Sequence, residues 1–322
     1  MYKVKCLVMV WFLLSCGTVM GQDKGRMAAH QQRMVQLLDL VASAPTDNER
    51  YLASEEAVDA LQDALDEHGS ERWTWHLPQS VSVLTSPDGR LRVFTWAVVR
   101  DNGDFECFGA VQYYNDRMET FEHAVLHDKS EDIMNREESL LTSDNWLGAI
   151  YQDIIQTIAG DRTYYTLLGW NGVDNLTDRR VIEPVLIRGG VPQFGAPVFR
   201  RERNLRRVVV EYRGDAAVQM AYEEQTVVEV TRERVKAKGR YHTVEKRKER
   251  KEKVIIFDEV EPQIVGMEGL YQYYVPSGLE LAYAWVDGKW ELRHGAQGRL
   301  GDKKLNKTFA PLPKSTPSYE YK

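Results

Sequence analysis

The chain has 322 residues and a mass of 37.1 kDa, with 43% hydrophobic and 28% charged residues. This length accommodates one large or two medium-sized domains, and the apolar fraction is too high for an intrinsically disordered protein. The mean hydropathy of −0.47 argues against a polytopic membrane protein, and three cysteines are too few for a disulfide-rich scaffold. A formal net charge of −6 argues against polyanion binding by the chain as a whole.

The N-terminal segment has the pattern of a secretory signal peptide. A short basic stretch with Lys3 and Lys5 precedes a nine-residue apolar run at 6–14, and small residues follow that run. Nine apolar residues are too few to span a bilayer as a helix, which needs about 20. The sequence therefore predicts an exported protein, periplasmic or associated with the outer membrane, whose residues 1–21 are a signal peptide.

Two ways of processing this segment stay open. Signal peptidase I would cleave after Gly21, or residues 13–16 (Leu-Leu-Ser-Cys) would act as a lipobox in which Cys16 carries a lipid. The apolar residues after Cys16 favour simple cleavage. We expect no transmembrane segment in the mature chain, and we expect Cys107, which lies between aromatic residues, to be a small buried hydrophobic residue and not a nucleophile.

Residues 22–70 are the one region with clear helical periodicity. Apolar residues recur at helical spacing over 27–41 and again over 57–65. The intervening residues 44–48 (Ala-Pro-Thr-Asp-Asn) are typical of a break between helices, and Gly69 is typical of a helix end. This pattern predicts an antiparallel pair of helices.

From Trp73 onward, short runs rich in Val, Ile, Thr, Tyr and Trp alternate with turn sequences. The Asp-Gly pair at 287–288 between two apolar runs is a strong hairpin signal. The sequence predicts a mainly antiparallel, sandwich-like β domain over 71–297 with the helical pair packed on it, which is an α+β fold overall. Residues 298–322, with three prolines and no periodicity, predict an extended tail.

Residues 232–253 concentrate positive charge. They hold eleven Lys or Arg and four Glu, a net charge of +7, which leaves 31 basic and 44 acidic residues, or −13, in the rest of the chain. The alternation of residue types up to Gly239 predicts a long β-hairpin with an apolar base and a charged tip. A short charged helix over 243–253 is the alternative.

Two roles for this basic segment stay open. It is either a solvated protrusion whose charges prevent pairing between sheet edges, or a docking arm for an acidic envelope protein or anionic lipid headgroups. Nucleic acid is disfavoured as a partner because the interleaved glutamates repel phosphates. The candidate partner-binding residues are Arg232, Arg234, Lys236, Lys238, Arg240, Lys246, Arg247 and Lys248.

The sequence carries no nucleophile elbow, phosphate loop, Rossmann glycine pattern or Cys-x-x-Cys pair, so we predict no catalytic residue and no cofactor. His123 and His127 have the spacing of a helical zinc pair, but the alternation over 121–127 favours a strand, so no metal site is predicted. Residues 169–178 are rich in oxygen ligands but lack the register of a calcium loop, which favours turn chemistry.

Aromatic residues support an alternative function. Trp170, with Asn171 and Asp174, would form a ligand surface if these side chains were exposed. The corresponding protein would be a carbohydrate- or peptidoglycan-binding module or a hydrolase. Cross-strand pairing and core packing explain the same aromatic residues.

Several segments together resemble a family of exported, functionally uncharacterised proteins of Bacteroidota. The most specific segment is 161–172 (Asp-Arg-Thr-Tyr-Tyr-Thr-Leu-Leu-Gly-Trp-Asn-Gly). The resemblance covers about 80–295, implies no catalytic residue, and makes the basic segment an insertion. The other segments that carry it are 86–96, 194–199, 256–259 and 287–290.

These bacteria commonly carry the type 9 secretion system, whose outer-membrane translocon is associated with a periplasmic plug subunit of broadly similar size. The resemblance therefore suggests an accessory role at that translocon. We expect a non-enzymatic exported interaction protein that docks on an outer-membrane assembly with an acidic surface.

Overall fold

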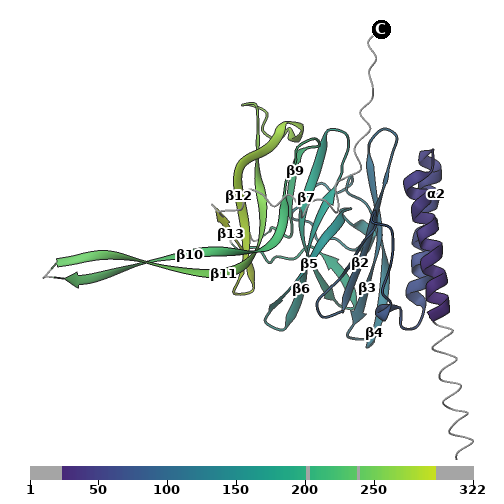
Figure 1. Cartoon of the computed structure of the whole chain (residues 1–322), viewed down its shortest axis with the longest axis horizontal. Coiled ribbons are helices and arrows are strands. Elements are labelled where there is room, and N and C mark those ends of the chain that lie inside the picture. Colours follow the sequence, from purple (N-terminus) through teal and green to yellow (C-terminus); the bar gives the residue numbers. More distant parts are fainter. Residues whose placement is uncertain (1–23, 201–203, 238–239, 295–322) are drawn as a thin grey trace, which may run out of the picture.

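The computed structural model describes residues 24–200, 204–237 and 240–294. The predicted signal peptide, including Cys16, and the predicted tail at 298–322 lie outside the described residues. The described chain consists mainly of antiparallel β-sheets, with two helices at its N-terminal end (Figure 1). The predicted fold class, mainly β within an α+β architecture, is confirmed.

The predicted helical pair is present. The first helix covers 24–43 of the described chain, and α2 runs from Asp47 to Asp66. An ion pair of 2.8 Å between Arg26 and Glu67 joins the start of the first helix to the end of the second, so the helices are antiparallel. Thr46 caps α2 because its hydroxyl accepts from the backbone N–H of Glu49, whose carboxylate accepts in return from the backbone N–H of Thr46.

Three antiparallel sheets follow the helices. Sheet I has the strand order β1-β2-β3-β4, sheet II the order β5-β6-β7-β8 with β9 also paired to β7, and sheet III the order β10-β11-β12-β13. Three short 3-10 turns, Ser70–Arg72, Ser143–Asn145 and Tyr271–Tyr273, lie in the connections. The strands are β1 Ser82–Thr85, β2 Leu91–Val99, β3 Phe105–Asn115, β4 Thr120–His127, β5 Ile150–Ala159, β6 Arg162–Asn171, β7 Thr177–Arg188, β8 Val191–Phe194, β9 Val208–Arg213, β10 Met220–Ala237, β11 Arg240–Pro262, β12 Tyr274–Val286 and β13 Lys289–His294.

The hairpin predicted at the Asp-Gly pair is confirmed as the connection between β12 and β13. Asp287 and Gly288 both have positive φ values, 49° and 77°. A two-residue turn of this kind matches the right-handed twist of the strands, and glycine adopts its conformation without steric cost. Val286 and Lys289 therefore pair directly across the turn.

The helices and the sheets stack as four layers (Figure 1). The helical pair covers one face of sheet I, where buried Leu38 and Leu61 pack with Trp96 of β2. The indole Nε1 of Trp96 donates to the buried hydroxyl of Ser54 on α2 at 2.8 Å. This polar contact fixes the helix on the sheet because both groups are removed from water.

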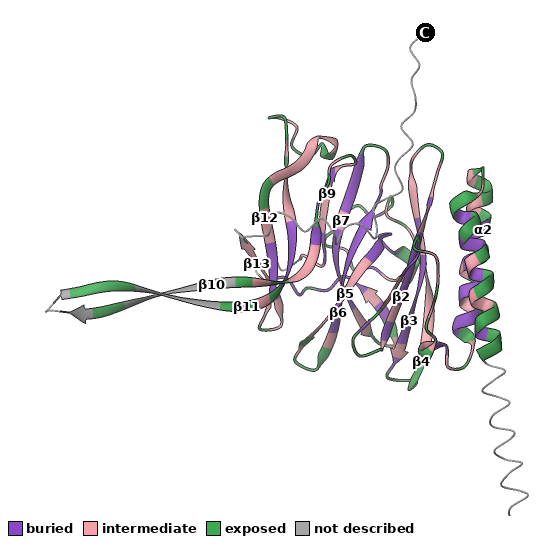
Figure 2. Ribbon diagram, viewed as in Figure 1, coloured by how far each residue is buried: buried purple, intermediate pink, exposed green. Residues whose placement is uncertain are grey.

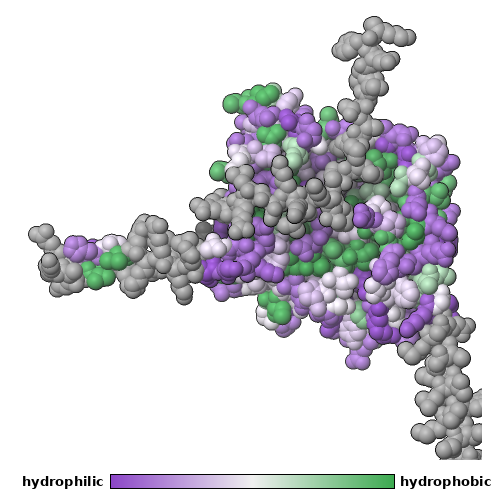
Figure 3. Space-filling view, in the orientation of Figure 1, coloured by the Kyte–Doolittle hydropathy of each residue, from purple (hydrophilic) through white to green (hydrophobic). Residues whose placement is uncertain are grey.

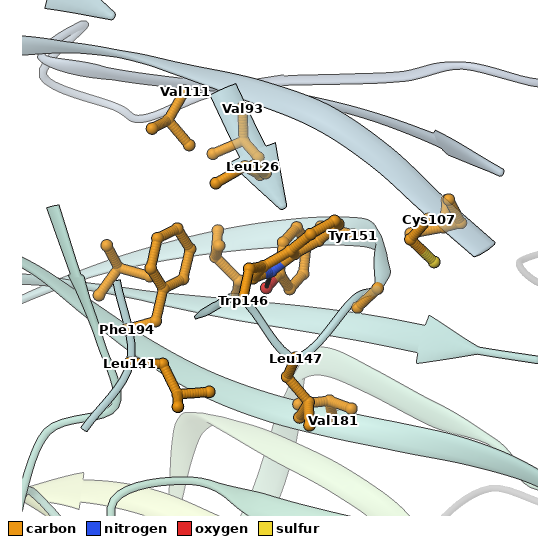
Figure 4. Close-up of a cluster of buried hydrophobic side chains, with 14 of the residues drawn as sticks. Val93, Cys107, Val111, Leu126, Leu141, Trp146, Leu147, Tyr151, Val181 and Phe194 are labelled. Carbon is orange, nitrogen blue, oxygen red and sulfur yellow. Dashed lines mark hydrogen bonds between the residues drawn. The ribbon is translucent and has the colours of Figure 1, made fainter. Parts of the chain in front are cut away.

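Sheet II lies between sheets I and III, so both of its faces are buried (Figure 2). On one side, Val93, Val111 and Leu126 of sheet I point toward Trp146 and Phe194 (Figure 4). A second cluster fills the space between sheets II and III, with Leu168, Ile255, Phe257, Tyr283 and Trp290 among its members. Burial on both faces makes sheet II the centre of the fold.

Candidate docking arm

The predicted basic hairpin is present, and it extends beyond the sheet from which it starts. The strands β10 and β11 pair without interruption from Met220–Phe257 to Ala237–Arg240. The next strand, β12, pairs with β11 only from Val254 onward. Residues 224–237 and 240–253, called the arm below, therefore form a ribbon of two strands with no third strand among the described residues. The alternative of a helix over 243–253 is wrong.

The arm projects from one end of the molecule, away from the layered body (Figures 1 and 3). Each of its strands contributes 14 residues, 224–237 and 240–253. At about 3.3 Å per residue, the ribbon is roughly 45 Å long. The last described residue pair of the arm, Ala237 and Arg240, therefore lies roughly 45 Å from the point where the arm leaves the body.

The base of the arm is anchored in the core. Val254 and Ile255 are buried at the point where the ribbon enters sheet III, and Phe257 stacks on Tyr283 with ring centroids 5.8 Å apart. At the same level the ammonium of Lys253 lies 5.6 Å from the centre of the Tyr222 ring. The buried apolar residues at the base of the arm are therefore followed by charged residues within one or two residue pairs, which agrees with the predicted hairpin with an apolar base and a charged tip.

Within the arm, the register opposes unlike charges. Glu224 pairs with Lys253, Glu229 with Lys248, and Arg232 with Glu245. Opposite charges across an antiparallel pair stabilise a ribbon, whereas like charges destabilise it. The carboxylate of Glu224 also accepts from the ammonium of Lys251 at 2.8 Å, and this contact lowers the pKa of Glu224 and raises the pKa of Lys251.

The arm stays basic after these pairs have formed. Its residues 224–237 and 240–253 hold ten Lys or Arg and six Glu, a net charge of +4, because the arm includes Glu224 and Glu229, which lie outside the segment 232–253, and does not include Lys238. The side chain of Arg234 is exposed, and its guanidinium lies 5.9 Å from the centre of the Tyr241 ring. Arg250 and Lys251 are exposed as well. Lys238 lies outside the described residues, and for the other candidate residues the structure gives only the strand and its register: Arg232, Lys236, Arg240, Lys246, Arg247 and Lys248.

The predicted ligand surface around Trp170 is not accessible. Trp170 is 9% exposed and packs edge-on against Phe105, and Asn171 is 3% exposed and donates to the carbonyl of Gly148 at 2.8 Å. Only Asp174 is half-buried, and its carboxylate accepts from the backbone N–H groups of Leu176 and Thr177. Asp174 therefore stabilises a turn, and Trp170 and Asn171 belong to the core. These three residues provide no exposed aromatic surface on which a sugar could stack.

An acidic groove that the sequence analysis did not single out lies on the opposite side of the molecule. It has a volume of about 620 Å³ and runs between α2 and the strands β3 and β4. Four acidic residues line it, Glu55 and Asp59 of α2, Glu106 of β3 and Asp128, together with the basic Lys129. Its sequence signal is the excess of acidic residues in α2, seven against the single basic Arg50.

Burial changes the acidity of the groups at this groove. It raises the pKa of Glu106, with a further contribution from the charge of Asp128. Burial also raises the pKa of Asp128, although backbone N–H groups of Cys107 and Ser130 donate to its carboxylate at 2.9 Å each. The thiol of Cys107 is buried, and its pKa lies well above the ordinary value. A protonated, buried thiol is a poor nucleophile, in agreement with its prediction as a core residue.

His123 and His127 lie on β4, which confirms the strand predicted for them. Residues four apart on a strand are separated by roughly 13 Å, which is too far for two imidazoles to share one ion. His123 instead lies 3.7 Å from the carboxylate of Asp66 on α2. Within 24–200, 204–237 and 240–294, no group of three or more His, Cys, Asp or Glu side chains is arranged to hold a metal ion.

No protein-family model, curated protein or solved structure matches this chain. Among the described helices, none combines the length and the apolar character needed to cross a membrane. What the arm and the acidic groove can bind is therefore inferred from their own geometry and charge.

Proposed function

We propose that the protein is a non-enzymatic, exported interaction module that docks through its arm on an acidic surface of an outer-membrane assembly. The observation that carries the proposal is the projection of a ribbon with a basic segment of +7 from a chain that is otherwise at −13. Because the arm that carries this basic segment is roughly 45 Å long, it reaches a partner before the acidic body approaches that partner.

Charge segregation supports a defined orientation of docking. An acidic partner attracts the arm and repels the body, so the complex forms through one end of the molecule. The association should be fast at low ionic strength and should weaken as salt screens the charges. Arg234, Arg250 and Lys251 are exposed, and the ion pairs of Arg250 with Glu252 and of Lys251 with Glu224 lie at the surface, where an acidic partner can compete for them.

The resemblance to exported Bacteroidota proteins supports a more specific assignment. In this proposal the acidic partner belongs to the type 9 secretion translocon, and the protein acts as a periplasmic accessory of its outer-membrane complex. The basic segment, an insertion relative to the family pattern, would then adapt this protein to its particular partner.

Affinity purification from envelope extracts tests the proposal. The tagged full chain is compared with a variant in which Arg234, Arg250 and Lys251 are changed to Glu. The matched control carries the same three changes of charge at exposed arginines of the body, Arg117, Arg162 and Arg188.

We expect an outer-membrane polypeptide to co-purify with the native chain and with the control, and to be lost from the arm variant. Recovery of the same polypeptide with all three proteins would contradict docking through the arm. Recovery of no envelope partner by the native chain would contradict the proposed function as a whole.

A further inference from the structure

One edge of sheet III is a long strand with an open side. The strand β10 has 18 residues and pairs only with β11 among the described strands. Its register with β11 has no bulge, and its sequence has no Pro or Gly. Proteins usually protect edge strands with bulges, prolines, short length or charged side chains, because unpaired N–H and C=O groups recruit another strand. Of these devices β10 has only charged residues.

The middle of this edge favours strand pairing in particular. Residues 226–231 read Thr-Val-Val-Glu-Val-Thr, so five of the six are β-branched. Such residues have the highest propensity for a paired strand. This stretch lies in the arm, away from the body, and no described strand covers its outer edge (Figure 1). It is therefore accessible to a strand from another molecule.

The order of charges along β10 indicates which strand fits. Its first ten residues, 220–229, are acidic, with Glu223, Glu224 and Glu229. Its last eight residues, 230–237, are mainly basic, with Arg232, Arg234 and Lys236 around Glu233. A strand with this order is complementary to its own sequence running in the opposite direction.

We propose that β10 pairs antiparallel with β10 of a second copy of this chain, around a two-fold axis at Val230. This inference uses the open backbone edge of β10, whereas the proposed docking function uses charged side chains of the arm, of which Arg234 also lies on β10. In the resulting ribbon of four strands, β11 with its basic residues 246–248 is the outer strand on each side. Two-fold dimers with self-complementary interfaces are the commonest oligomers of soluble proteins.

The charges select this register. A two-fold axis perpendicular to the sheet places residues of equal parity opposite each other, so the central residue defines the pairing. With Val230 at the centre, Glu224 lies opposite Lys236 and no like charges meet over 223–237. A centre at Val227 also avoids like charges but brings no opposite charges together. The remaining centres between 226 and 232 oppose like charges: Glu223 and Glu229 for Thr226, Glu223 and Glu233 for Val228, two copies of Glu229 for Glu229, Glu229 and Glu233 for Thr231, and two copies of Arg232 for Arg232.

The arrangement also avoids collision between the two bodies. In antiparallel pairing centred on Val230, the base of each arm lies beside the tip of the other. Because each arm is roughly 45 Å long, the bodies lie at opposite ends of the shared ribbon. The dimer is then held by backbone hydrogen bonds along the strand and by the two symmetric Glu224–Lys236 pairs.

Disulfide trapping tests the register. In the chain that begins at Gln22, the only native cysteine is Cys107, which is buried. A Val230→Cys variant places two cysteines opposite each other at the axis, within the distance that a disulfide requires. In the control variant, Thr226→Cys, the two cysteines are roughly 26 Å apart because each lies opposite Arg234. We expect a covalent dimer under oxidation from Val230→Cys and none from Thr226→Cys.

A charge swap tests the contact in solution by sedimentation. Glu224→Lys should weaken the dimer by about tenfold or more, because two attractive pairs become repulsive. Adding Lys236→Glu should restore it. Within one chain, residue 224 is beside Lys251 and Lys253 and is twelve positions from residue 236, so this rescue requires a second copy.

Three results would overturn the inference. The chain would sediment as a monomer at all concentrations, Thr226→Cys would cross-link as readily as Val230→Cys, or the double variant would remain as weak as Glu224→Lys. The variant Arg250→Glu changes only β11 and leaves β10 native. Loss of envelope partners from this variant, with a dimer that forms normally, would support both the inference and the docking proposal.

Discussion

Arg207 and Glu183 form an ion pair in the interior of the molecule, with Nε and Oε1 2.6 Å apart and both side chains 0% exposed. The guanidinium also donates to the carbonyl oxygens of Ser139 and Phe194, at 2.8 and 2.9 Å, and Tyr151 donates its hydroxyl proton to Glu183 at 2.5 Å. This network ties the connection before β5 to the central sheet. Each polar group has a partner, as burial demands.

Removing one member of this pair should destabilise the protein strongly. Arg207→Met leaves the carboxylate of Glu183 buried without its counter-charge, which costs about 3–5 kcal/mol. Urea unfolding followed by fluorescence measures the change. Asp116→Asn is the control, because Asp116 pairs with Arg90 at the surface with its side chain 75% exposed, and exposed pairs contribute about 1 kcal/mol or less. Equal destabilisation by the two changes would contradict this view of the network.

The local elements could be predicted from the sequence because their signals are local. The break at 44–48, the Asp287–Gly288 turn and the charge gradient of the arm each lie within a few residues of the structure they specify. The short strands Ser82–Thr85 and Val191–Phe194 were not predicted. Four residues carry too little periodicity to be distinguished from a loop.

The burial of Trp170 could not be predicted by the same means. In β6 every residue from Tyr164 to Asn171 is buried, because sheets I and III cover both faces of sheet II. Alternation of polar and apolar residues, which separates a solvent face from a core face, is therefore lost. The contact of Glu183 with Arg207, 24 positions apart, follows from the pairing of β7 with β9, in which Ile182 lies opposite Val208. No local pattern in the sequence specifies this long-range pairing.

A buried hydrogen bond between sheets II and III should contribute measurably to stability. The indole Nε1 of Trp290 donates to the hydroxyl of Thr166 at 3.1 Å, and both residues are 0% exposed. Thr166→Val keeps the shape of the side chain but leaves the indole N–H without an acceptor, which should cost about 1–3 kcal/mol of unfolding free energy.

Thr157→Val is the matched control for this measurement. The hydroxyl of Thr157 is buried and has no hydrogen-bond partner within the described chain. Its replacement by a methyl group removes a desolvation cost and should leave the protein equally stable or more stable. If both valine variants lost the same free energy, the contact with Trp290 would not explain the effect.

The cap of α2 should govern the start of that helix. Thr46→Ala removes the hydroxyl that accepts from Glu49 N, and we expect a loss of about 0.5–2 kcal/mol in unfolding free energy, with faster amide exchange in the first turn. Thr46→Ser keeps the hydroxyl and should behave like the native chain. Unchanged exchange rates in the alanine variant would show that packing on sheet I alone determines where α2 begins.

The acidic groove should make the stability of the protein depend on pH. Burial first, and then the charge of Asp128, raise the pKa of Glu106 above the ordinary value of 4.5. A carboxyl with a raised pKa binds its proton more tightly in the folded chain, so its contribution is complete below the unfolded pKa. That contribution is lost as the pH rises through the folded pKa, because the folded state then holds a buried charge.

The variant Glu106→Gln removes this ionisation while keeping the size of the side chain. The unfolding free energy of the native chain should therefore fall relative to that of Glu106→Gln as the pH rises from below 4.5 toward neutrality. Urea unfolding at a series of pH values measures the difference, and the exposed Glu268→Gln serves as control with a smaller dependence on pH. The difference in unfolding free energy between the native chain and Glu106→Gln would contradict this prediction if it stayed constant or changed in the opposite direction. Glu106 would then be stabilised as a carboxylate in the folded protein by its contact with Arg100 at 2.7 Å.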